Sequence, residues 1–277
     1  MKYKCKICGT EASHKVYRVK EMYFGTAEEF AYFECENCQC MQIAEIPDNL
    51  ADYYGNDYYS FSKPKLPKVS ADGVNEARVL DVGCGAGKWL LNQYEKGYVN
   101  LFGCDPFIEE DISYEPCIHI KKCTIHEMQE TFDLIRLGDS FEHVSDPLET
   151  LLSIKRLLSD TGICLINTPL FPNAAYDICG VNWYGWDAPR HLFLHSRKSM
   201  EYLCSKTGLH IEEVICNAND RQFISSLLYQ RGIPLVEQTD EVVRKHFSEE
   251  EIQKFAEYSD ALNSKGYGDH AIFVIKK

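Results

Sequence analysis

The segment that most constrains the fold is a glycine-rich turn after a short apolar run. Val79–Val82 is predicted to form a strand, and glycine then recurs at Gly83, Gly85 and Gly87. Glycines let the backbone turn tightly and approach a ligand closely. A helix starting near Lys88 would present its first backbone N–H groups at the same place. The pattern therefore predicts a nucleotide-like ligand at a strand–turn–helix junction.

Two common nucleotide-binding loops do not fit this turn. A dinucleotide fingerprint needs glycine three positions after Gly85, where Lys88 stands. A phosphate-binding P-loop needs glycine at position 82 and Ser or Thr at position 89, which are Val82 and Trp89. The remaining pattern is Asp-x-Gly-x-Gly-x-Gly, which begins at Asp81.

Short apolar runs alternate with amphipathic stretches after residue 77, which predicts an α/β fold with an open, mostly parallel sheet covered on both faces. Strands are expected at 78–82, 101–104, 134–137, 163–167, 211–216 and 271–275. Helices are expected at 88–96, 147–158, 197–207 and 247–262. The clearest helix start has Asp146 as N-cap, Pro147 at the first helical position and Glu149 in a capping box.

Two Cys-x-x-Cys pairs mark the N-terminal 50 residues. The pairs are Cys5 with Cys8 and Cys35 with Cys38, and 26 residues between them allow a hairpin that brings them together. Four thiolates at about 2.3 Å suit a tetrahedral Zn²⁺. A ribbon-like module of this size buries little apolar area, so we expect a structural ion that contributes folding energy. The alternative is four ordinary buried thiols.

Composition narrows the choice of compartment and partner. The chain has 13 cysteines and no visible signal sequence, so we expect a reducing, cytoplasmic location. No apolar run approaches the roughly 18 residues of a membrane span, so no membrane partner is expected. A net charge of −13 disfavours nucleic acid, which needs a basic face. Residues 1–20 are locally basic, with Lys2, Lys4, Lys6, Lys15, Arg18 and Lys20 against Glu11.

With the residues that follow it, the glycine turn resembles the class I S-adenosylmethionine-dependent methyltransferases. Their second motif is an acid at the end of the next strand, which Asp105 matches 24 residues after Asp81. That separation suits one helix between adjacent parallel strands. Residues 132–147 resemble the fourth motif of the family, and residues 158–169 resemble its helix-to-strand turn and the strand that ends in proline.

This resemblance implies a Rossmann-like, mostly parallel seven-stranded sheet, an S-adenosylmethionine cofactor and methyl transfer. The carboxylate of Asp105 would accept hydrogen bonds from the two ribose hydroxyls. The residues implied to bind the cofactor are Asp81, Gly83, Cys84, Gly85, Gly87, Asp105, Pro106, Asp139 and Ser140. The alternative is a Rossmann-like domain that binds another nucleotide or none.

More narrowly, the chain resembles bacterial methyltransferases linked to sugar and surface-polysaccharide biosynthesis. A zinc-binding segment, a Tyr-rich stretch, the methyltransferase core and a Pro-Arg-His-Leu segment carry this resemblance. The chain is accordingly divided into a four-cysteine zinc module at 1–50, a Tyr-rich connecting segment at 51–75 and a methyltransferase domain at 76–277. The implied acceptor is a small molecule, a sugar or nucleotide-linked sugar methylated at oxygen or carbon.

The candidate catalytic residues lie after predicted strands, where loops line the ligand crevice of an α/β sheet. His191, within residues 182–196, is the favoured base because imidazole accepts protons near neutral pH. Glu142 and His143 are further candidates, with an orientation network beneath the cofactor as the alternative. Candidate substrate-binding residues are Trp183, Trp186, Arg190 and Tyr59.

Aromatic faces suit a sugar ring and an arginine suits an anion. The alternative is that both tryptophans belong to the core and that Arg190 pairs with a structural acid. The tyrosines of the connecting segment are expected either to form a lid over the cofactor or to pack that segment onto the core.

Three functions are compatible with these patterns. The first is a small-molecule methyltransferase with a zinc-stabilised N-terminal segment. The second is an RNA-modifying methyltransferase whose zinc module holds RNA, which the basic residues 1–20 favour. The third is a non-catalytic S-adenosylmethionine-binding protein, which the intact set of Asp81, Gly83, Gly85 and Asp105 disfavours.

Overall fold

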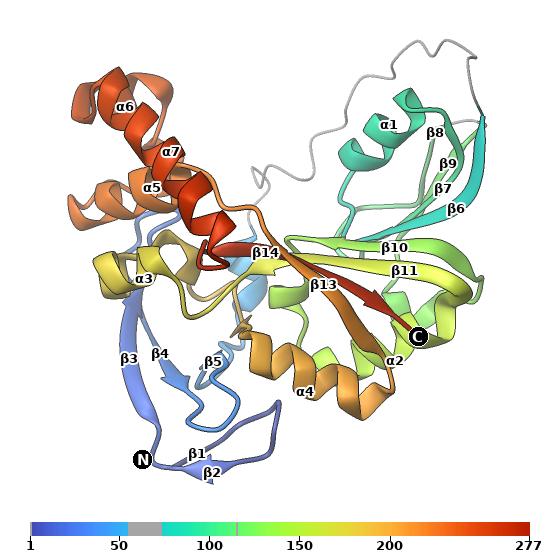
Figure 1. The fold of residues 1–277 in the computed structure, drawn as a ribbon, viewed down its shortest axis with the longest axis horizontal. Helices are drawn as coiled ribbons and strands as arrows, with labels where there is room; N and C mark the ends of the chain where they lie inside the picture. Colours follow the sequence, from blue (N-terminus) through green and yellow to red (C-terminus); the bar gives the residue numbers. More distant parts are fainter. Residues whose placement is uncertain (1, 55–73, 115) are drawn as a thin grey trace. The chain divides into compact units, whose positions relative to one another are not determined.

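The structure, a computed structural model, describes residues 2–54, 74–114 and 116–277 (Figure 1). The chain forms two compact units that are each assembled from separate stretches. The cysteine unit comprises Met1–Tyr53, Thr168–Tyr202 and Val214–Ile272. The glycine-turn unit comprises Tyr54–Asn167, Leu203–Glu213 and Phe273–Lys277. The division of the chain at residues 50 and 75 stays a prediction.

The glycine-turn unit is built around an eight-stranded sheet with the order β13-β14-β11-β10-β6-β7-β9-β8. The strands are β6 (Asn75–Val82), β7 (Tyr98–Cys104), β8 (Ile112–Tyr114), β9 (Ile118–Lys121), β10 (Phe132–Gly138), β11 (Leu158–Pro169), β13 (His210–Cys216) and β14 (His270–Lys276). The pairs β10–β11, β10–β6, β6–β7 and β7–β9 are parallel, whereas β8 is antiparallel to β9.

The α/β fold and its mostly parallel sheet are as predicted, but the described residues of this sheet form eight strands rather than seven. All six strands located in the sequence are present. Neither β8 nor β9 was located in the sequence; β8 is only three residues long and β9 only four. Such short strands show too little alternation to be recognised from the sequence.

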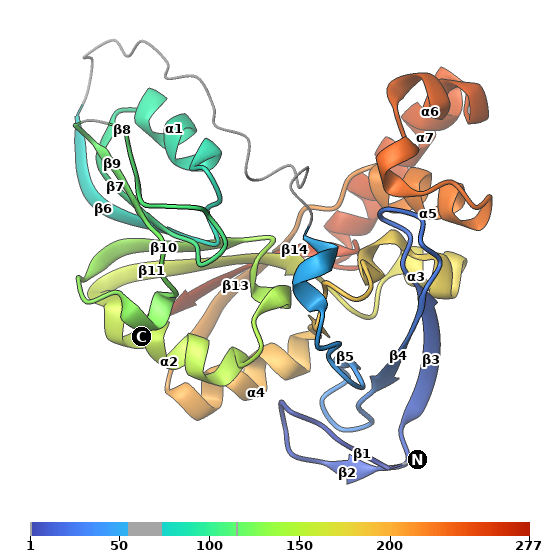
Figure 2. The same cartoon turned by 180° about the vertical axis from the view of Figure 1, so that it is seen from behind.

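Helices cover both faces of this sheet (Figures 1 and 2). α1 (Lys88–Glu95) lies on one face, where Leu90 and Leu91 pack with Leu101 of β7. α2 (Pro147–Leu157) lies on the other. Its start is as predicted, because the Asp146 side chain accepts a hydrogen bond of 3.0 Å from the backbone N–H of Glu149.

The order of the strands reverses at β6. From β6 the chain runs outward through β7 and β9, and it then returns to β10 on the opposite side of β6. In open parallel sheets, ligands bind beside the carboxyl ends of the strands at such a reversal. The turn after β6 and the loops after β7 and β10 therefore meet at the ligand-binding end of the sheet.

The cysteine unit contains a four-stranded sheet with the order β12-β5-β4-β3 and a separate pair, β1 with β2. The strands are β1 (Tyr3–Lys4), β2 (Glu11–Ala12), β3 (Lys15–Lys20), β4 (Glu29–Glu34), β5 (Met41–Ile43) and β12 (Phe193–Leu194). Phe193 of β12 pairs with Gln42 of β5. A late segment of the chain thus completes the N-terminal sheet.

The other helices follow β11. They are α3 (Ala174–Cys179), α4 (Arg197–Thr207), α5 (Arg221–Gln230), α6 (Asp240–His246) and α7 (Glu249–Ser264). Short 3₁₀ helices are η1 (Leu50–Tyr53), η3 (Ile125–Glu127), η4 (Phe141–His143), η5 (Gly180–Asn182), η6 (Tyr184–Trp186) and η7 (Leu235–Glu237). Among the described residues, none of the helices has the length and apolar character needed to cross a membrane.

Candidate functional site

The turn after β6 has a backbone that requires glycine. Gly83, Gly85 and Gly87 have φ values of 71°, 52° and 82°, a region that other residues rarely adopt. A Cβ on Gly83 would lie 2.7 Å from the Cβ of Ser140, and one on Gly87 would lie 2.5 Å from the Cδ1 of Ile120. Backbone conformation and lack of space thus both explain the glycine pattern and leave a backbone cradle for a ligand.

Asp105 lies directly after β7, next to the turn. Its Oδ2 accepts a hydrogen bond of 2.9 Å from the N–H of Gly85, and its Oδ1 accepts one of 2.8 Å from the N–H of Phe107. Burial raises the pKa of Asp105, and these N–H groups oppose the rise. The two hydrogen bonds hold the carboxylate in place, and each of its oxygens has a further lone pair for a ligand hydroxyl. This arrangement fits the ribose diol of a nucleoside cofactor.

Asp81 supports the turn through an ion pair. Its Oδ1 lies 2.8 Å from Nη1 of Arg136, which is its register neighbour on β10. The guanidinium also lies 4.6 Å from the ring centroid of Trp89. Burial raises the pKa of Asp81 to about 6, although Arg136 lowers it. Arg136 was not among the predicted site residues, although an arginine within the apolar run of β10 was a usable signal.

The loop after β10 borders the turn from the other side. Ser140 donates a hydrogen bond of 2.9 Å to the carbonyl of Val82. Asp139 has a φ of 55° and donates its N–H to the carbonyl of Asn167 at 2.9 Å. Such a conformation in a non-glycine residue is uncommon and concentrates at functional sites. Eight of the nine predicted cofactor residues therefore follow the carboxyl ends of β6, β7 and β10, and Asp81 is the last residue but one of β6.

Two candidate catalytic residues lie in the same loop. Glu142 is buried, and His143 is half-buried at the end of η4. The Nδ1 of His143 shares a hydrogen bond of 3.0 Å with the hydroxyl of Tyr54. The ring of Tyr54 stacks on Phe107, with centroids 5.5 Å apart and planes 12° apart. Tyr54 was expected only as one of the tyrosines that form a lid or pack the connecting segment, and Phe107 was not predicted as a site residue. Nothing local in the sequence relates Tyr54 to His143, which lies 89 residues away.

The structure places Trp183 and Trp186 in the core of the cysteine unit. They are 0% and 1% exposed. The indole N–H of Trp183 donates to Asp269 at 2.9 Å, and that of Trp186 donates to the carbonyl of Gly180 at 3.0 Å. Both rings also contact the ring of Tyr176. This burial corrects the expectation that the two rings face a sugar and favours the core interpretation.

Arg190 is also buried, with an exposed fraction of 0%. Its guanidinium forms a two-point contact with Asp187, donates at 3.1 Å to the carbonyl of Tyr53 and lies 3.5 Å from Glu21. It also lies 4.3 Å from the ring centroid of Tyr23. Arg190 thus pairs with structural acids, which corrects its expected role in binding a substrate anion.

His191, the favoured base, belongs to the cysteine unit. Its Nδ1 lies 2.8 Å from the carbonyl oxygen of Gly185. A carbonyl oxygen only accepts, so Nδ1 carries the hydrogen and donates it. Its Nε2 lies 3.7 Å from the carboxylate of Asp187. This orientation leaves Nε2 as the proton-accepting atom, and the catalytic role of His191 stays a prediction. Tyr59 lies outside the described residues.

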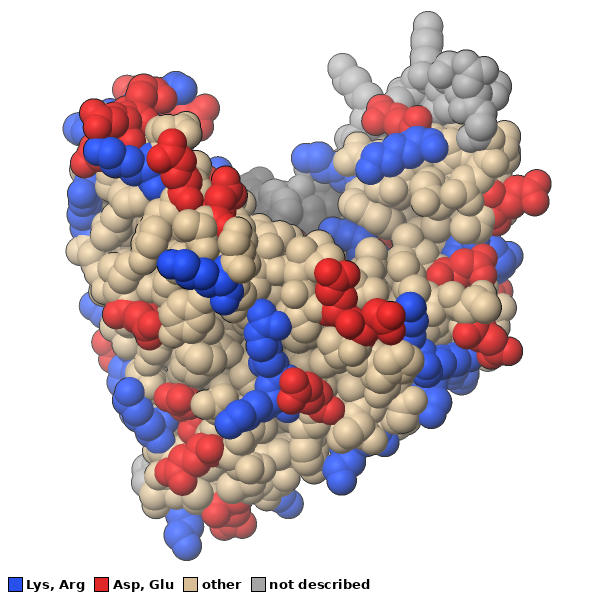
Figure 3. All heavy atoms as spheres, in the orientation of Figure 1, with Lys and Arg blue, Asp and Glu red and all other residues tan. Residues whose placement is uncertain are grey.

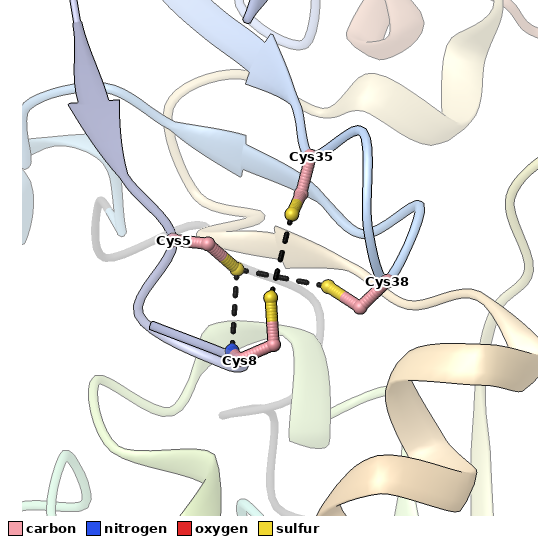
Figure 4. Close-up of side chains that lie close together, drawn as sticks. All are labelled: Cys5, Cys8, Cys35 and Cys38. Carbon is pink, nitrogen blue, oxygen red and sulfur yellow. Dashed lines mark hydrogen bonds between the residues drawn. The ribbon is translucent and has the colours of Figure 1, made fainter. Parts of the chain in front are cut away.

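The four cysteines of the two Cys-x-x-Cys pairs point toward a common centre (Figure 4). All four Sγ atoms lie within 4.8 Å of one another. Cys5 and Cys38 are 3.6 Å apart, and Cys8 and Cys35 are 3.5 Å apart, with all four present as free thiols. Sulfurs bound tetrahedrally at about 2.3 Å would be about 3.8 Å apart. The cluster therefore fits a zinc ion.

A family described as "methyltransferase domain" matches residues 54–214, which is more than half of the chain. The match contains the glycine turn, Asp105 and the loop after β10. The chain belongs to this methyltransferase-domain family, within the class I S-adenosylmethionine-dependent methyltransferases. The family resemblance inferred from the sequence is thereby confirmed.

Two relatives have similar sequences over part of the chain. A tRNA U34 carboxymethyltransferase of Campylobacter hominis is 26% identical over 140 residues, which are 47% of this chain and 48% of that protein. A ubiquinone biosynthesis O-methyltransferase of Actinobacillus pleuropneumoniae is 32% identical over 113 residues, which are 35% and 48%. The chain thus spans about half the length of these relatives.

Among solved structures, a cyclopropane synthase of Mycobacterium tuberculosis is similar over 75% of this chain and 80% of its own, with a TM-score of 0.46 and 18% identity.

Proposed function

We propose that this chain transfers a methyl group from S-adenosylmethionine to a hydroxyl of a small molecule. The observation that carries this proposal is the carboxylate of Asp105, held by Gly85 and Phe107 at the reversal point of the sheet. The backbone of Gly83–Gly87 would hold the methionine half of the cofactor, and Asp105 would hold the ribose. When bound, this cofactor supplies a methyl group activated on a sulfonium sulfur.

The chain's own residues would align the acceptor and remove its proton. We propose His143 as the base, because it belongs to the same unit and the same strand ends as the cofactor residues. Nε2 of its imidazole would take the hydroxyl proton, and the acceptor oxygen would keep the electron pair. His191 is retained as the sequence-based alternative.

The proposed acceptor is a hydroxylated small molecule. Support comes from the similarity to a protein named as an O-methyltransferase of ubiquinone biosynthesis. A sugar or nucleotide-linked sugar, methylated at oxygen or carbon, stays a prediction from the sequence. Its support is reduced, because Trp183, Trp186 and Arg190 are buried in the core.

Comparing two histidine variants tests the proposed base. His143→Ala should lower turnover by roughly 10²–10⁴-fold on an accepted substrate and leave S-adenosylmethionine affinity unchanged. His191→Ala is the matched variant. Its turnover per folded molecule should equal that of the wild type, even if its stability is lower. Normal turnover of His143→Ala would reject His143 as the base, and a selective loss in His191→Ala would assign that role to His191.

Methylation of RNA is the second candidate function. All six basic side chains of residues 2–20 are exposed, and one relative is named as a tRNA-modifying enzyme. Against it, acidic and basic side chains are mixed over the face in Figure 3, and the net charge is −13. Filter binding with mixed tRNA should show no retention at about 0.15 M salt, whereas a salt-dependent micromolar affinity would favour the RNA function.

We also propose that Cys5, Cys8, Cys35 and Cys38 hold one structural Zn²⁺. Protein thiolates would fill all four positions of the ion, which leaves no open position for catalysis. The ion would stabilise the turns that join β1 to β2 and β4 to β5. Elemental analysis of the freshly purified chain should find one zinc per chain.

A further inference from the structure

Tyr54 contacts the loops that follow two different strands of the glycine-turn unit. Its ring stacks on Phe107, in the loop after β7, with a centroid distance of 5.5 Å. Its hydroxyl lies 3.0 Å from Nδ1 of His143, in the loop after β10. The rings of Tyr54 and His143 also meet edge to face, with centroids 5.9 Å apart and planes 69° apart. Two independent contacts thus fix the position of the phenol.

These two loops flank the glycine turn. β6 lies between β7 and β10 in the sheet, and adjacent strands are about 4.8 Å apart, so β7 and β10 are about 10 Å apart. A residue that contacts both loops therefore crosses the carboxyl end of β6. Phe107 is itself anchored, because its N–H donates to Asp105 at 2.8 Å. Tyr54 thereby links the ribose-binding side of the site to His143.

We propose that Tyr54 is a positioning residue that selects the tautomer of His143, an inference that rests on the proposed function. The contact of 3.0 Å suits either direction, because a hydroxyl both donates and accepts. In the proposed arrangement the Nδ1–H of His143 donates to the Tyr54 oxygen, so Nε2 carries the lone pair that accepts a proton. A neutral imidazole with no such partner prefers the tautomer with hydrogen on Nε2, which cannot act as a base there. A hydrogen bond at one ring nitrogen commonly decides which form is present.

The stacked contact holds the hydroxyl of Tyr54 beside His143. Phe107 has an exposed fraction of 61%, and the phenol ring lies nearly parallel to it, 12° from coplanar. That stacking limits rotation of the phenol and keeps its oxygen at Nδ1. The ring of Tyr54 therefore fixes its position, and the hydroxyl forms the hydrogen bond with His143. A substitution that removes only the hydroxyl distinguishes these two roles.

The experiment compares the wild-type chain with Tyr54→Phe, which keeps the ring and removes the hydroxyl. Nitrogen NMR of the imidazole, assigned with His143→Gln and recorded without cofactor, should show hydrogen mainly on Nδ1 in the wild type. In Tyr54→Phe it should move mainly to Nε2. The kcat on an accepted substrate should fall roughly 10- to 100-fold, whereas the Kd for S-adenosylmethionine should stay unchanged.

The neighbouring tyrosine offers a matched control. The hydroxyl of Tyr53 donates to Glu28, so Tyr53→Phe should leave both the tautomer of His143 and kcat unchanged. The proposal is overturned if the wild type carries its hydrogen on Nε2, or if kcat falls in Tyr54→Phe without a change of tautomer. Failure of the wild type to bind S-adenosylmethionine would reject the proposed function, while the NMR comparison would still decide the role of Tyr54.

Discussion

The glycine turn at 83–87 and the loop at 182–196 both contain residues that are typical of binding sites, but these residues have different roles in the structure. In the glycine turn, positive φ angles and close contacts create a backbone cradle beside Asp105. In the 182–196 loop, Trp183, Trp186 and Arg190 are buried and bonded within the cysteine unit. One region has a backbone conformation that suits a ligand, whereas the side chains of the other pack and form hydrogen bonds within the cysteine unit.

This difference shows which sequence signals are specific. Alternate glycines followed by an acid at the end of the next strand satisfy backbone requirements that few other structures share. Aromatic rings and an arginine occur both in ligand pockets and in protein cores. In this chain Arg190 is buried and pairs with Asp187, three residues earlier. The residue types in the 182–196 loop therefore predicted a cluster of large side chains, but they could not show whether the cluster lines a pocket or packs in a core.

Removing one thiolate of the four-sulfur cluster should have the largest effect. Binding of structural zinc contributes about 10–16 kcal/mol of apparent free energy in small zinc modules, so Cys35→Ser should lose the ion and the ordered N-terminal sheet. Elemental analysis and calorimetric unfolding measure both. The half-buried Cys117 lies outside the cluster, and Cys117→Ser should retain one zinc. A zinc-free wild type with full stability would contradict this prediction.

Replacing Arg190 tests directly whether the 182–196 loop has a structural role. Arg190→Ala leaves the buried carboxylate of Glu21 and the half-buried carboxylate of Asp187 without their cation, and breaking a buried pair costs about 3–5 kcal/mol. Urea unfolding should show this loss, while the affinity for S-adenosylmethionine should not change. The exposed Arg18 is the control, and its change to Ala should cost less than about 0.5 kcal/mol. Normal stability with weakened acceptor binding would instead restore the substrate-binding interpretation.

Local patterns in the sequence predicted most of the glycine-turn unit. The six predicted strands and the helices α1 and α2 have clear periodicity, and the start of α2 has its own capping signal. The predicted helices α4 and α7 lie partly or wholly in the cysteine unit. The pairing of β12 with β5 was not predictable, because a two-residue strand carries no periodicity and its partner lies about 150 residues earlier. The contacts of Arg190 with Glu21 and of Tyr54 with His143 are likewise products of tertiary structure.

A third prediction concerns the pH dependence of stability. Burial raises the pKa of Asp269 from its ordinary value of 3.8 to about 6, although Trp183 and His270 lower it. The folded state therefore binds this proton more tightly than the unfolded state. The resulting stabilisation is present below about pH 4 and is lost as the pH rises through about 6, which amounts to about 3 kcal/mol.

Asp269→Asn should remove this part of the pH dependence, because the amide oxygen can still accept the hydrogen bond from Trp183. Urea unfolding between about pH 4 and pH 7 measures the slope. The slope that remains belongs in part to Asp81, whose pKa burial also raises to about 6. Asp260 is exposed, and Asp260→Asn should leave the wild-type slope intact. An equal slope in Asp269→Asn and the wild type would show that Asp269 titrates normally in the folded state.

The smallest expected effect is a loss of cofactor affinity in Asp105→Ala. It tests ligand binding directly, whereas the other predictions test folding. Asp105→Ala should weaken S-adenosylmethionine binding by about 1.5–3 kcal/mol, the range for losing charge-assisted hydrogen bonds. Calorimetric titration measures this, with Glu110→Ala as a control at an exposed acid in the same segment. Because the Asp105 carboxylate also accepts the N–H groups of Gly85 and Phe107, thermal unfolding must be measured in parallel. A loss of affinity that exceeds any loss of stability would assign Asp105 to the ligand, which is the reverse of the result expected for Arg190. Unchanged affinity would place the ribose site elsewhere and remove the functional difference between the two regions.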